Sequence, residues 1–239
     1  FDISWAFQTE QNGTGHAVAQ AMPNVDPEAT VIVLYGDVPL IRSSTLQQLL
    51  DQTQAQQGLT LLTVKLDNPM GYGRIVRNAA GEIQAIVEQK DASPEQLKIN
   101  EVNTGILAVS AKYLNEWLPK LSSNNAQGEY HLTDIIAMAV SQGVAVSAIH
   151  PHDEYEVQGV NDRLQLSELE RVYQRQQADE LLRAGVSLAD PSRLDIRGTL
   201  TVGNDVAIDV GCIFEGDVTL ADGVHVGPYC VIKDSKIGA

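Results

Sequence analysis

Short apolar runs alternate with helix-like segments over residues 1–161. The runs have the length of single strands, and the first is continuous enough for a strand buried on both faces; they cover residues 30–35, 59–64, 83–87 and 104–109. The intervening segments predict helices over residues 16–22, 44–54, 112–121 and 132–142. This alternation predicts an α/β layer fold with a mostly parallel sheet.

The pattern changes twice after residue 161. Residues 162–184 form a long polar segment with an irregular apolar face, which stops at Gly185. This segment carries no recognisable chemistry, and we interpret it as a linker helix. Residues 185–239 follow a third pattern, so we expect an α/β domain over 1–161, the linker over 162–184 and a repeat domain over 185–239.

A six-residue repeat defines the last part of the chain. One bulky apolar residue recurs at every sixth position, at Val202, Ile208, Phe214, Leu220, Val226 and Ile232. A second series at the same spacing comprises Val206, Cys212, Val218, Val224 and Cys230. This period is typical of a parallel β-helix, in which stacked coils bury the apolar row. Sandwich strands at irregular spacing are the alternative.

Charge narrows the class of partner. The net charge is −15, so the surface repels nucleic acid and anionic lipid. A phosphate ligand would need positive charge supplied locally, from a metal, a Lys or Arg, or backbone amides. No apolar run reaches the roughly 18 residues of a membrane span. We therefore expect neither a nucleic-acid partner nor a membrane partner.

Cysteine usage and the chain ends add two expectations. Cys212 and Cys230 lie one coil apart in the same series, and we interpret them as reduced core residues of a cytoplasmic protein, not as a redox or metal site. The chain begins at Phe1 without Met or a signal-like segment and stops within the repeat. We expect an internal fragment of a longer protein.

A candidate ligand site follows the first predicted strand. Tyr35, Gly36 and Asp37 come directly after it, and ligands of open α/β sheets bind beyond the carboxyl ends of strands. Gly36 would let a ligand approach the backbone, and Asp37 is a hard oxygen ligand suited to Mg²⁺ beside a phosphate. A simple turn aspartate remains the alternative.

Other polar residues also flank the apolar runs. Residues 12–16 form a Gly-rich turn before a helix, where Thr14 would cap the helix or hold a ligand. Gly73 precedes a strand, Glu88 follows one and Asn103 precedes another, while Asn161 lies at the end of the first part. This layout suits a ligand crevice along one sheet edge, and it also suits ordinary loops.

Seven segments together resemble one family, and they occur in the family's order. They are residues 8–17 (QTEQNGTGHA), 34–40 (LYGDVPL), 71–75 (GYGRI), 87–92 (VEQKDA), 101–106 (EVNTGI), 125–130 (NAQGEY) and 159–161 (GVN). The resemblance is to the bifunctional uridylyltransferase and acetyltransferase family usually called GlmU, and it covers essentially the whole chain. It implies a Rossmann-like nucleotidyltransferase domain, incomplete here, then the linker helix and the first coils of a left-handed parallel β-helix.

The resemblance also implies a reaction. In that family UTP and N-acetylglucosamine 1-phosphate give UDP-N-acetylglucosamine and pyrophosphate with Mg²⁺, for peptidoglycan and lipopolysaccharide precursors. Gln8, Gly13 and Thr14 would contact the uracil, while Tyr35, Gly36 and Asp37 would line the nucleotide and sugar site. Gly73, Glu88 and Asn103 would bind the amino sugar. Asp37 and Asn161 would hold Mg²⁺ and act as the catalytic pair.

The chain also departs from the family pattern. The family's first Gly-rich loop with its Arg and Lys is absent, as is most of the β-helix with its acetyltransferase base and coenzyme A site. Acetyl-CoA would thus be a partner only of the complete parent, and we expect neither activity to be intact in this chain. His131 stands where a second Tyr is expected, and we assign it no role.

Two other functions remain open. The first is a different sugar-1-phosphate nucleotidyltransferase, such as one that uses dTTP and glucose 1-phosphate; the repeat and the segments around Glu88 and Asn103 weigh against it. The second is a non-catalytic assembly module, since left-handed β-helices commonly form homotrimers.

Overall fold

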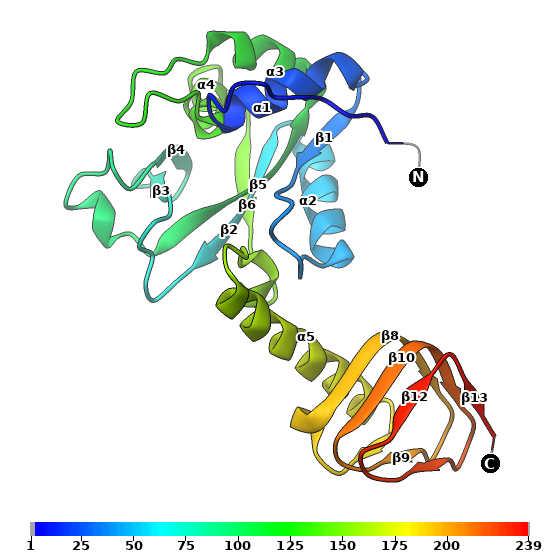
Figure 1. Ribbon diagram of the computed structural model, residues 1–239. Coiled ribbons are helices and arrows are strands. Elements are labelled where there is room, and N and C mark those ends of the chain that lie inside the picture. The colour runs from blue at the N-terminus through cyan, green and yellow to red at the C-terminus, as the bar shows by residue number, and fades with distance from the viewer. Residues whose placement is uncertain (1–2, 239) are drawn as a thin grey trace. The chain divides into compact units, whose positions relative to one another are not determined.

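A computed structural model describes residues 3–238 (Figure 1). Contacts divide the chain into two compact units, Phe1–Gly159 and Val160–Ala239. The first unit is an α/β structure built on one sheet, and the second consists of a long helix and short parallel strands. None of the helices formed by residues 3–238 is long and apolar enough to cross a bilayer.

One six-stranded sheet organises the first unit. Its strands are β1 (Thr30–Val33), β2 (Leu59–Lys65), β3 (Arg74–Arg77), β4 (Ile83–Val87), β5 (Glu101–Ser110) and β6 (Val146–Ile149). The order is β4-β3-β5-β2-β6, and β1 pairs with the second half of β5. The long strand β5 therefore joins the β3–β4 hairpin to the rest of the sheet (Figure 1).

The expectation of a mostly parallel sheet was wrong. Only β2 and β6 pair in parallel among the described strands of this sheet, and β5 is antiparallel to β1, β2 and β3. The short connection between β3 and β4 makes a hairpin, which requires antiparallel pairing. The strand β1 is only partly buried, whereas β2 is buried over its first six residues. Apolar runs alone do not encode strand direction.

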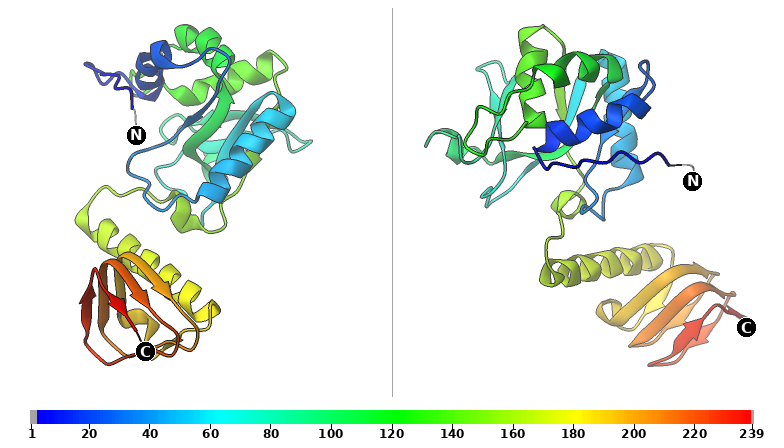
Figure 2. Two further views of the ribbon diagram at one scale, coloured as in Figure 1. Left: turned by 90° about the vertical axis from the view of Figure 1, so that its right-hand side faces the viewer. Right: turned by 45° about the horizontal axis from the view of Figure 1, so that its top comes forward.

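Helices cover both faces of the sheet. They are α1 (Thr14–Ala21), α2 (Ser43–Gln56), α3 (Ala111–Trp117) and α4 (Ile135–Ser141). One core cluster joins α1, α3 and α4 to one face, with Trp117 and Ile135 fully buried. A second cluster packs Leu49 of α2 against the opposite face, together with Val38 and Val157 (Figure 2). The predicted helices exist, with ends displaced by a few residues.

The second unit pairs a helix with stacked strands. Helix α5 (Arg163–Arg183) precedes β7 (Ser187–Leu188), β8 (Leu194–Val202), β9 (Ala207–Ile208), β10 (Cys212–Leu220), β11 (His225–Val226), β12 (Val231–Lys233) and β13 (Lys236–Ile237). The strands pair in parallel, for example Phe214 with Ile196 and with Ile232, which lie 18 residues away in sequence on each side. The two six-residue series supply most of this core, and both cysteines are free.

Candidate functional site

Three of the residues assigned to the sugar lie in one row across three strands. Arg74 of β3 is opposite Val87 of β4 and Val102 of β5. Extending both registers by one residue places Gly73 between Glu88 and Asn103, and the Asn103 amide donates to the Gly73 carbonyl at 2.9 Å. Directly opposite residues of antiparallel strands project to the same face. Glu88 and Asn103 therefore flank Gly73 on one face of the sheet.

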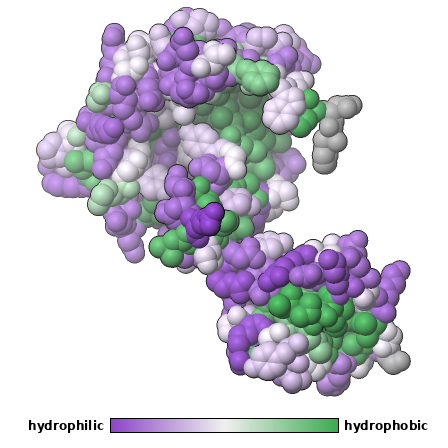
Figure 3. Space-filling view, viewed as in Figure 1, coloured by the Kyte–Doolittle hydropathy of each residue, from purple (hydrophilic) through white to green (hydrophobic). Residues whose placement is uncertain are grey.

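Neighbouring side chains pack closely against Gly73, which has no side chain of its own. An added Cβ would lie 2.9 Å from Ile86 Cγ2 and 3.3 Å from each carboxylate oxygen of Glu88. Asn103 Oδ1 is buried and accepts no hydrogen bond from the described residues. A buried acceptor without a donor is rare in native proteins and points to a missing partner. The face drawn in Figure 3 is hollowed over the first unit, and apolar side chains line the hollow.

Tyr35, which follows β1, lies beside this row and next to Gly105 of β5. Its ring packs on the backbone of Gly105, whose φ of +83° is left-handed; a Cβ at Gly105 would lie 2.1 Å from Tyr35 Cε2. Burial raises the pKa of the Tyr35 hydroxyl, and the carboxylates of Glu88 and Asp37 raise it further. The Tyr35 hydroxyl is therefore close enough to interact electrostatically with both Glu88 of the row and Asp37, the candidate metal ligand.

Asp37 lies in the exposed loop between β1 and α2. A Cβ added to Gly159 would be 3.3 Å from Asp37 Oδ2, so the ends of two distant segments meet at this carboxylate. Gly36 has open space around it, since an added Cβ would meet no atom within 4 Å. Asn161 is exposed and its amide donates to Gln165 Oε1 at 2.7 Å. Because Asn161 belongs to the second unit, its pairing with Asp37 stays a prediction.

The donor set can be compared with what Mg²⁺ requires. In residues 3–238 no group of three or more His, Cys, Asp or Glu could hold a metal ion. Mg²⁺ keeps several waters and usually binds through one or two carboxylates together with substrate phosphates. The exposed Asp37 carboxylate fits that mode, because the phosphates would complete the coordination.

The Gly-rich turn has a structural role that the sequence did not reveal. Gly13 adopts a φ of +107°, and a Cβ there would lie 2.6 Å from the Tyr130 carbonyl oxygen. The Gly15 amide donates to that carbonyl at 2.8 Å. Gln8 Nε2 donates to the Gly13 carbonyl at 3.1 Å and approaches His16 Nδ1 at 3.0 Å. The turn is thus held against residues 129–132.

The sequence left two roles open for Thr14, and the first of them, capping of the helix, is wrong. The N-cap of α1 is Gly13, which has no side-chain cap, and Thr14 is the first helical residue. Its hydroxyl oxygen accepts a hydrogen bond from the Leu132 amide at 3.0 Å. Thr14 is exposed, so the hydroxyl proton is available to a ligand.

Sequence reasoning missed the residue that connects this turn to the row. Thr133 follows Leu132 in a short 3-10 helix, Leu132–Asp134, and its hydroxyl donates to Glu88 Oε1 at 3.1 Å. Nothing in the local pattern marks Thr133, because its partner lies just past the end of β4, far away in sequence. His131, to which no role was assigned, is buried.

Arg74 is a second residue that the sequence did not single out. It is 2% exposed, and its guanidinium donates to the Tyr72 carbonyl and to Gln89 Oε1, while Nε is buried without a partner among the described residues. Gln89 Oε1 also accepts from the Gly71 amide. Arg74 and Gln89 together hold the loop before Gly73 against the end of β4.

Known proteins resemble the chain over its whole length. The protein named "Bifunctional protein GlmU" from Marinobacter nauticus is 61% identical over 235 residues, covering 98% of this chain and 52% of that protein. The protein of the same name from Dechloromonas aromatica is 60% identical over 238 residues, covering 100% of this chain and 52% of its own length. The chain therefore spans about half the length of the curated relatives it matches.

A solved structure matches part of the chain, and a family model matches residues within the first unit. The structure described as a putative glucose-1-phosphate thymidylyltransferase from Bacillus anthracis in complex with a sucrose matches with a TM-score of 0.51 at 21% identity, over 68% of this chain and 61% of that one. This likeness concerns the fold alone, a nucleotidyltransferase α/β fold. The model of the family "Nucleotidyl transferase" matches residues 1–156, well over half of the 239 residues. The chain therefore belongs to the nucleotidyl transferase family.

Proposed function

We propose that the chain carries the uridylyltransferase site of a bifunctional GlmU-type enzyme. That enzyme forms UDP-N-acetylglucosamine from UTP and N-acetylglucosamine 1-phosphate, for peptidoglycan and lipopolysaccharide precursors in the cytoplasm. One observation carries this proposal: Glu88 and Asn103 flank the side-chain-free Gly73 in a single row, and the buried Asn103 Oδ1 accepts no hydrogen bond from residues 3–238. The identity of 61% to a GlmU protein supports the same assignment.

The row has the chemistry that an N-acetylated sugar needs. A carboxylate accepts hydrogen bonds from sugar hydroxyls, and the free Asn103 oxygen accepts from the acetamido N–H. The two flanking strands lie about 9–10 Å apart across β3, which leaves room for one pyranose ring over Gly73. Tyr35 would cover the ring from the side of β1, with Gly36 open for the phosphates.

The Gly-rich turn would bind the uracil. Gly13 and Thr14 lie at the N-terminal end of α1, where the first backbone amides have no partner within the helix, and Gln8 packs beside them. The contacts of Leu132 with Thr14 and of Thr133 with Glu88 connect this turn to the sugar row. The base and the sugar of one UDP-sugar would therefore be held by a continuous set of contacts.

The transfer itself needs alignment and charge neutralisation. A phosphate oxygen of the sugar phosphate bonds to the α-phosphorus of UTP, while the bond from that phosphorus to pyrophosphate breaks. No covalent nucleophile on the protein is required. Asp37 would hold Mg²⁺ together with Asn161, whose Cα is kept within about 8 Å of that of Gly159 by covalent geometry. When bound, Mg²⁺ would neutralise phosphate charge.

The second unit has a proposed role of its own. We propose that its strands form the first coils of a left-handed β-helix, with α5 as the linker; the parallel pairing and the buried six-residue series support this. We expect homotrimers through this part and acetyl-CoA binding only in the complete parent. Sedimentation of the chain in solution would give the mass of the assembly, and a strictly monomeric chain at high concentration would contradict this part of the proposal.

Calorimetry tests the sugar-nucleotide site directly. UDP-N-acetylglucosamine would be titrated with Mg²⁺ into the wild-type chain and into Asp37→Ala, with folding checked by circular dichroism. Binding that weakens in the variant supports the proposal. UDP-glucose and dTDP-glucose serve as competitors, because tighter binding of either one favours the alternative nucleotidyltransferase. A folded chain that binds none of them contradicts the assignment.

A further inference from the structure

A fully buried carboxylate ties the Asp37 loop to the segment that ends at Gly159. Glu156 is 0% exposed. Its Oε2 accepts from the Thr45 hydroxyl at 2.6 Å, and its Oε1 accepts from the His152 amide at 2.9 Å and lies 3.5 Å from Arg42 Nε. Two of these partners, Arg42 and Thr45, lie at the start of α2. Thr45 is 111 residues away from Glu156 in sequence.

One of the two segments follows Asp37 in the sequence, and the other leads to Gly159, which faces Asp37. Arg42 and Thr45 follow the Asp37 loop, and Glu156 lies in a short 3-10 helix, Glu154–Val157, three residues before Gly159. Apolar contacts join the same two segments, because Val38 and Val157 belong to one core cluster. Arg42 Nη2 also donates to Asp153 Oδ2 at 2.9 Å. The contacts of Glu156 therefore set the spacing at which Gly159 faces the Asp37 carboxylate.

Stability alone does not explain why a carboxylate is buried at this position. Desolvation of a carboxylate opposes its burial, and apolar residues of similar volume often serve stability as well or better. What the charge adds is geometry, because charge-assisted hydrogen bonds are short and directional. The N-terminal end of α2 also favours an anion, through its helix dipole. The Glu156 cluster is consequently suited to hold two segments at one fixed separation.

We infer that Glu156 is a positioning residue for the divalent cation at Asp37. It acts through Thr45 and Arg42, which fix the loop, and through the short helix that leads to Gly159. Glu156 itself does not touch the cation or the substrate. This inference rests on the proposed function, in which Asp37 binds the cation.

The test uses three variants of the complete 239-residue chain and one matched control. Glu156→Gln removes the charge and keeps the shape. Thr45→Val removes the hydroxyl donor, and Thr45→Ser restores it. The control is Glu101→Gln, because Glu101 is a second buried carboxylate that accepts from a threonine, Thr63, and pairs with an arginine away from Asp37.

Two measurements separate positioning from general destabilisation. Hydrogen exchange reports the protection of residues 34–41, and electron paramagnetic resonance reports Mn²⁺ affinity in the presence of saturating UDP-N-acetylglucosamine. Partners that orient a metal ligand typically contribute about 10- to 100-fold to metal affinity. We expect faster exchange and at least about tenfold weaker Mn²⁺ binding in Glu156→Gln and Thr45→Val. Thr45→Ser and Glu101→Gln should match the wild type in both measurements.

Each contrary result has a distinct meaning. Unchanged exchange of residues 34–41 in both Glu156→Gln and Thr45→Val would overturn the inference. Equal loss of Mn²⁺ affinity in Glu101→Gln would also overturn it, because the effect would then be general. A wild-type chain that binds neither UDP-N-acetylglucosamine nor Mn²⁺ contradicts the proposed function instead, and hydrogen exchange then tests the Glu156 cluster on its own.

Discussion

Gly73 and Glu88 face each other so closely that any side chain on Gly73 would contact the Glu88 carboxylate. An added Cβ would lie 3.3 Å from both carboxylate oxygens. Gly73 does not have a left-handed φ, so the backbone would accept alanine there. The glycine is therefore required because Ile86 and Glu88 leave too little space for a Cβ, not for its conformation.

Gly73→Ala should weaken binding of UDP-N-acetylglucosamine by about tenfold or more, equivalent to ~1.4 kcal/mol. The methyl group would crowd the Glu88 carboxylate and shift it away from the sugar, while the melting temperature should change by only a few degrees. The control is Gly227→Ala, since an added Cβ at Gly227 meets no atom within 4 Å. Calorimetry gives the affinities, and equal affinities of the two variants would contradict a sugar site over Gly73.

Asn103→Ala should separate binding from stability. Removing the unpaired Asn103 oxygen relieves its desolvation penalty, which is about 1–3 kcal/mol and offsets the lost packing. The free energy of unfolding should therefore change little, while sugar-nucleotide binding falls. Thr104→Val is the matched control, because the Thr104 hydroxyl has its own partner, the Leu62 carbonyl at 2.7 Å. Urea unfolding and calorimetry should show the opposite pattern for Thr104→Val, with stability lowered and binding retained.

Glu101 should make the chain less stable in acid. The hydrogen bond from Arg77 lowers the pKa of the Glu101 carboxyl below its ordinary value of 4.5, burial opposes this, and the Thr63 hydroxyl lowers the pKa further. A lowered pKa in the folded state gives stability that is present above the unfolded value and lost as pH falls through the folded value. Glu101→Gln should be less stable than the wild type at pH 7, with the difference shrinking below pH 4.5. A difference that is the same at every pH in urea unfolding would rule out this explanation.

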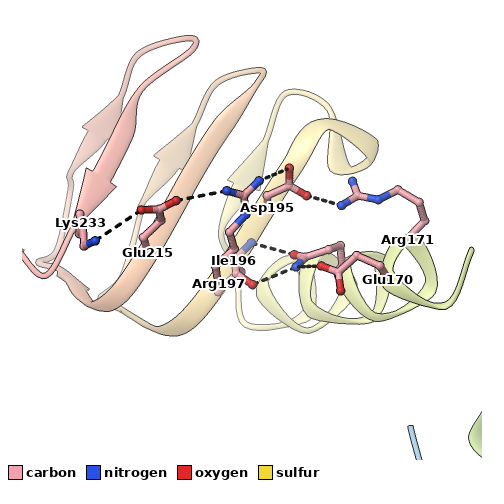
Figure 4. A network of polar contacts seen from close by, with 8 residues as sticks. Glu170, Arg171, Asp195, Ile196, Arg197, Glu215 and Lys233 are labelled. Carbon is pink, nitrogen blue, oxygen red and sulfur yellow. Dashed lines mark hydrogen bonds and ion pairs between the residues drawn. The ribbon is translucent and has the colours of Figure 1, made fainter. Parts of the chain in front are cut away.

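The second unit should depend on its apolar row far more than on its ion pairs. Glu215 lies between Arg197 and Lys233 on adjacent strands, at 3.2 Å and 3.9 Å, and all three side chains reach solvent (Figure 4). Exposed pairs of this kind contribute about 0–1 kcal/mol. Phe214, the residue before Glu215, is 1% exposed. Replacing a core Phe by Ala lowers the free energy of unfolding by about 3–5 kcal/mol.

Glu215→Gln should therefore lower the free energy of unfolding by less than about 1 kcal/mol, and Phe214→Ala by about 3–5 kcal/mol. Thermal and urea unfolding monitored by circular dichroism give both values. A larger effect from Glu215→Gln would mean that the charges, and not the apolar row, hold these strands together. Raising the salt concentration should reduce only the Glu215 effect, because screening acts on exposed charges.

Local pattern was enough for the elements and for much of the core. The apolar run of residues 83–87 became β4 with the same bounds, and the six-residue spacing placed Ile208, Phe214 and Leu220 in the buried core. Both follow from side-chain periodicity, which is a property of neighbouring residues. The sequence also predicted Glu88 just after a strand, which is where it lies, and Asn103 just before one, whereas Asn103 lies inside β5.

Tertiary structure alone decided which of these residues meet. The antiparallel direction of β5, and its register with β3, put Asn103 beside Gly73. Thr133 and Glu156 became visible only through partners on distant segments. Hydrophobic spacing determines which face of an element is buried, but direction and register depend on hydrogen bonds between strands far apart in the chain. The row at Gly73 therefore exists only once those strands have paired.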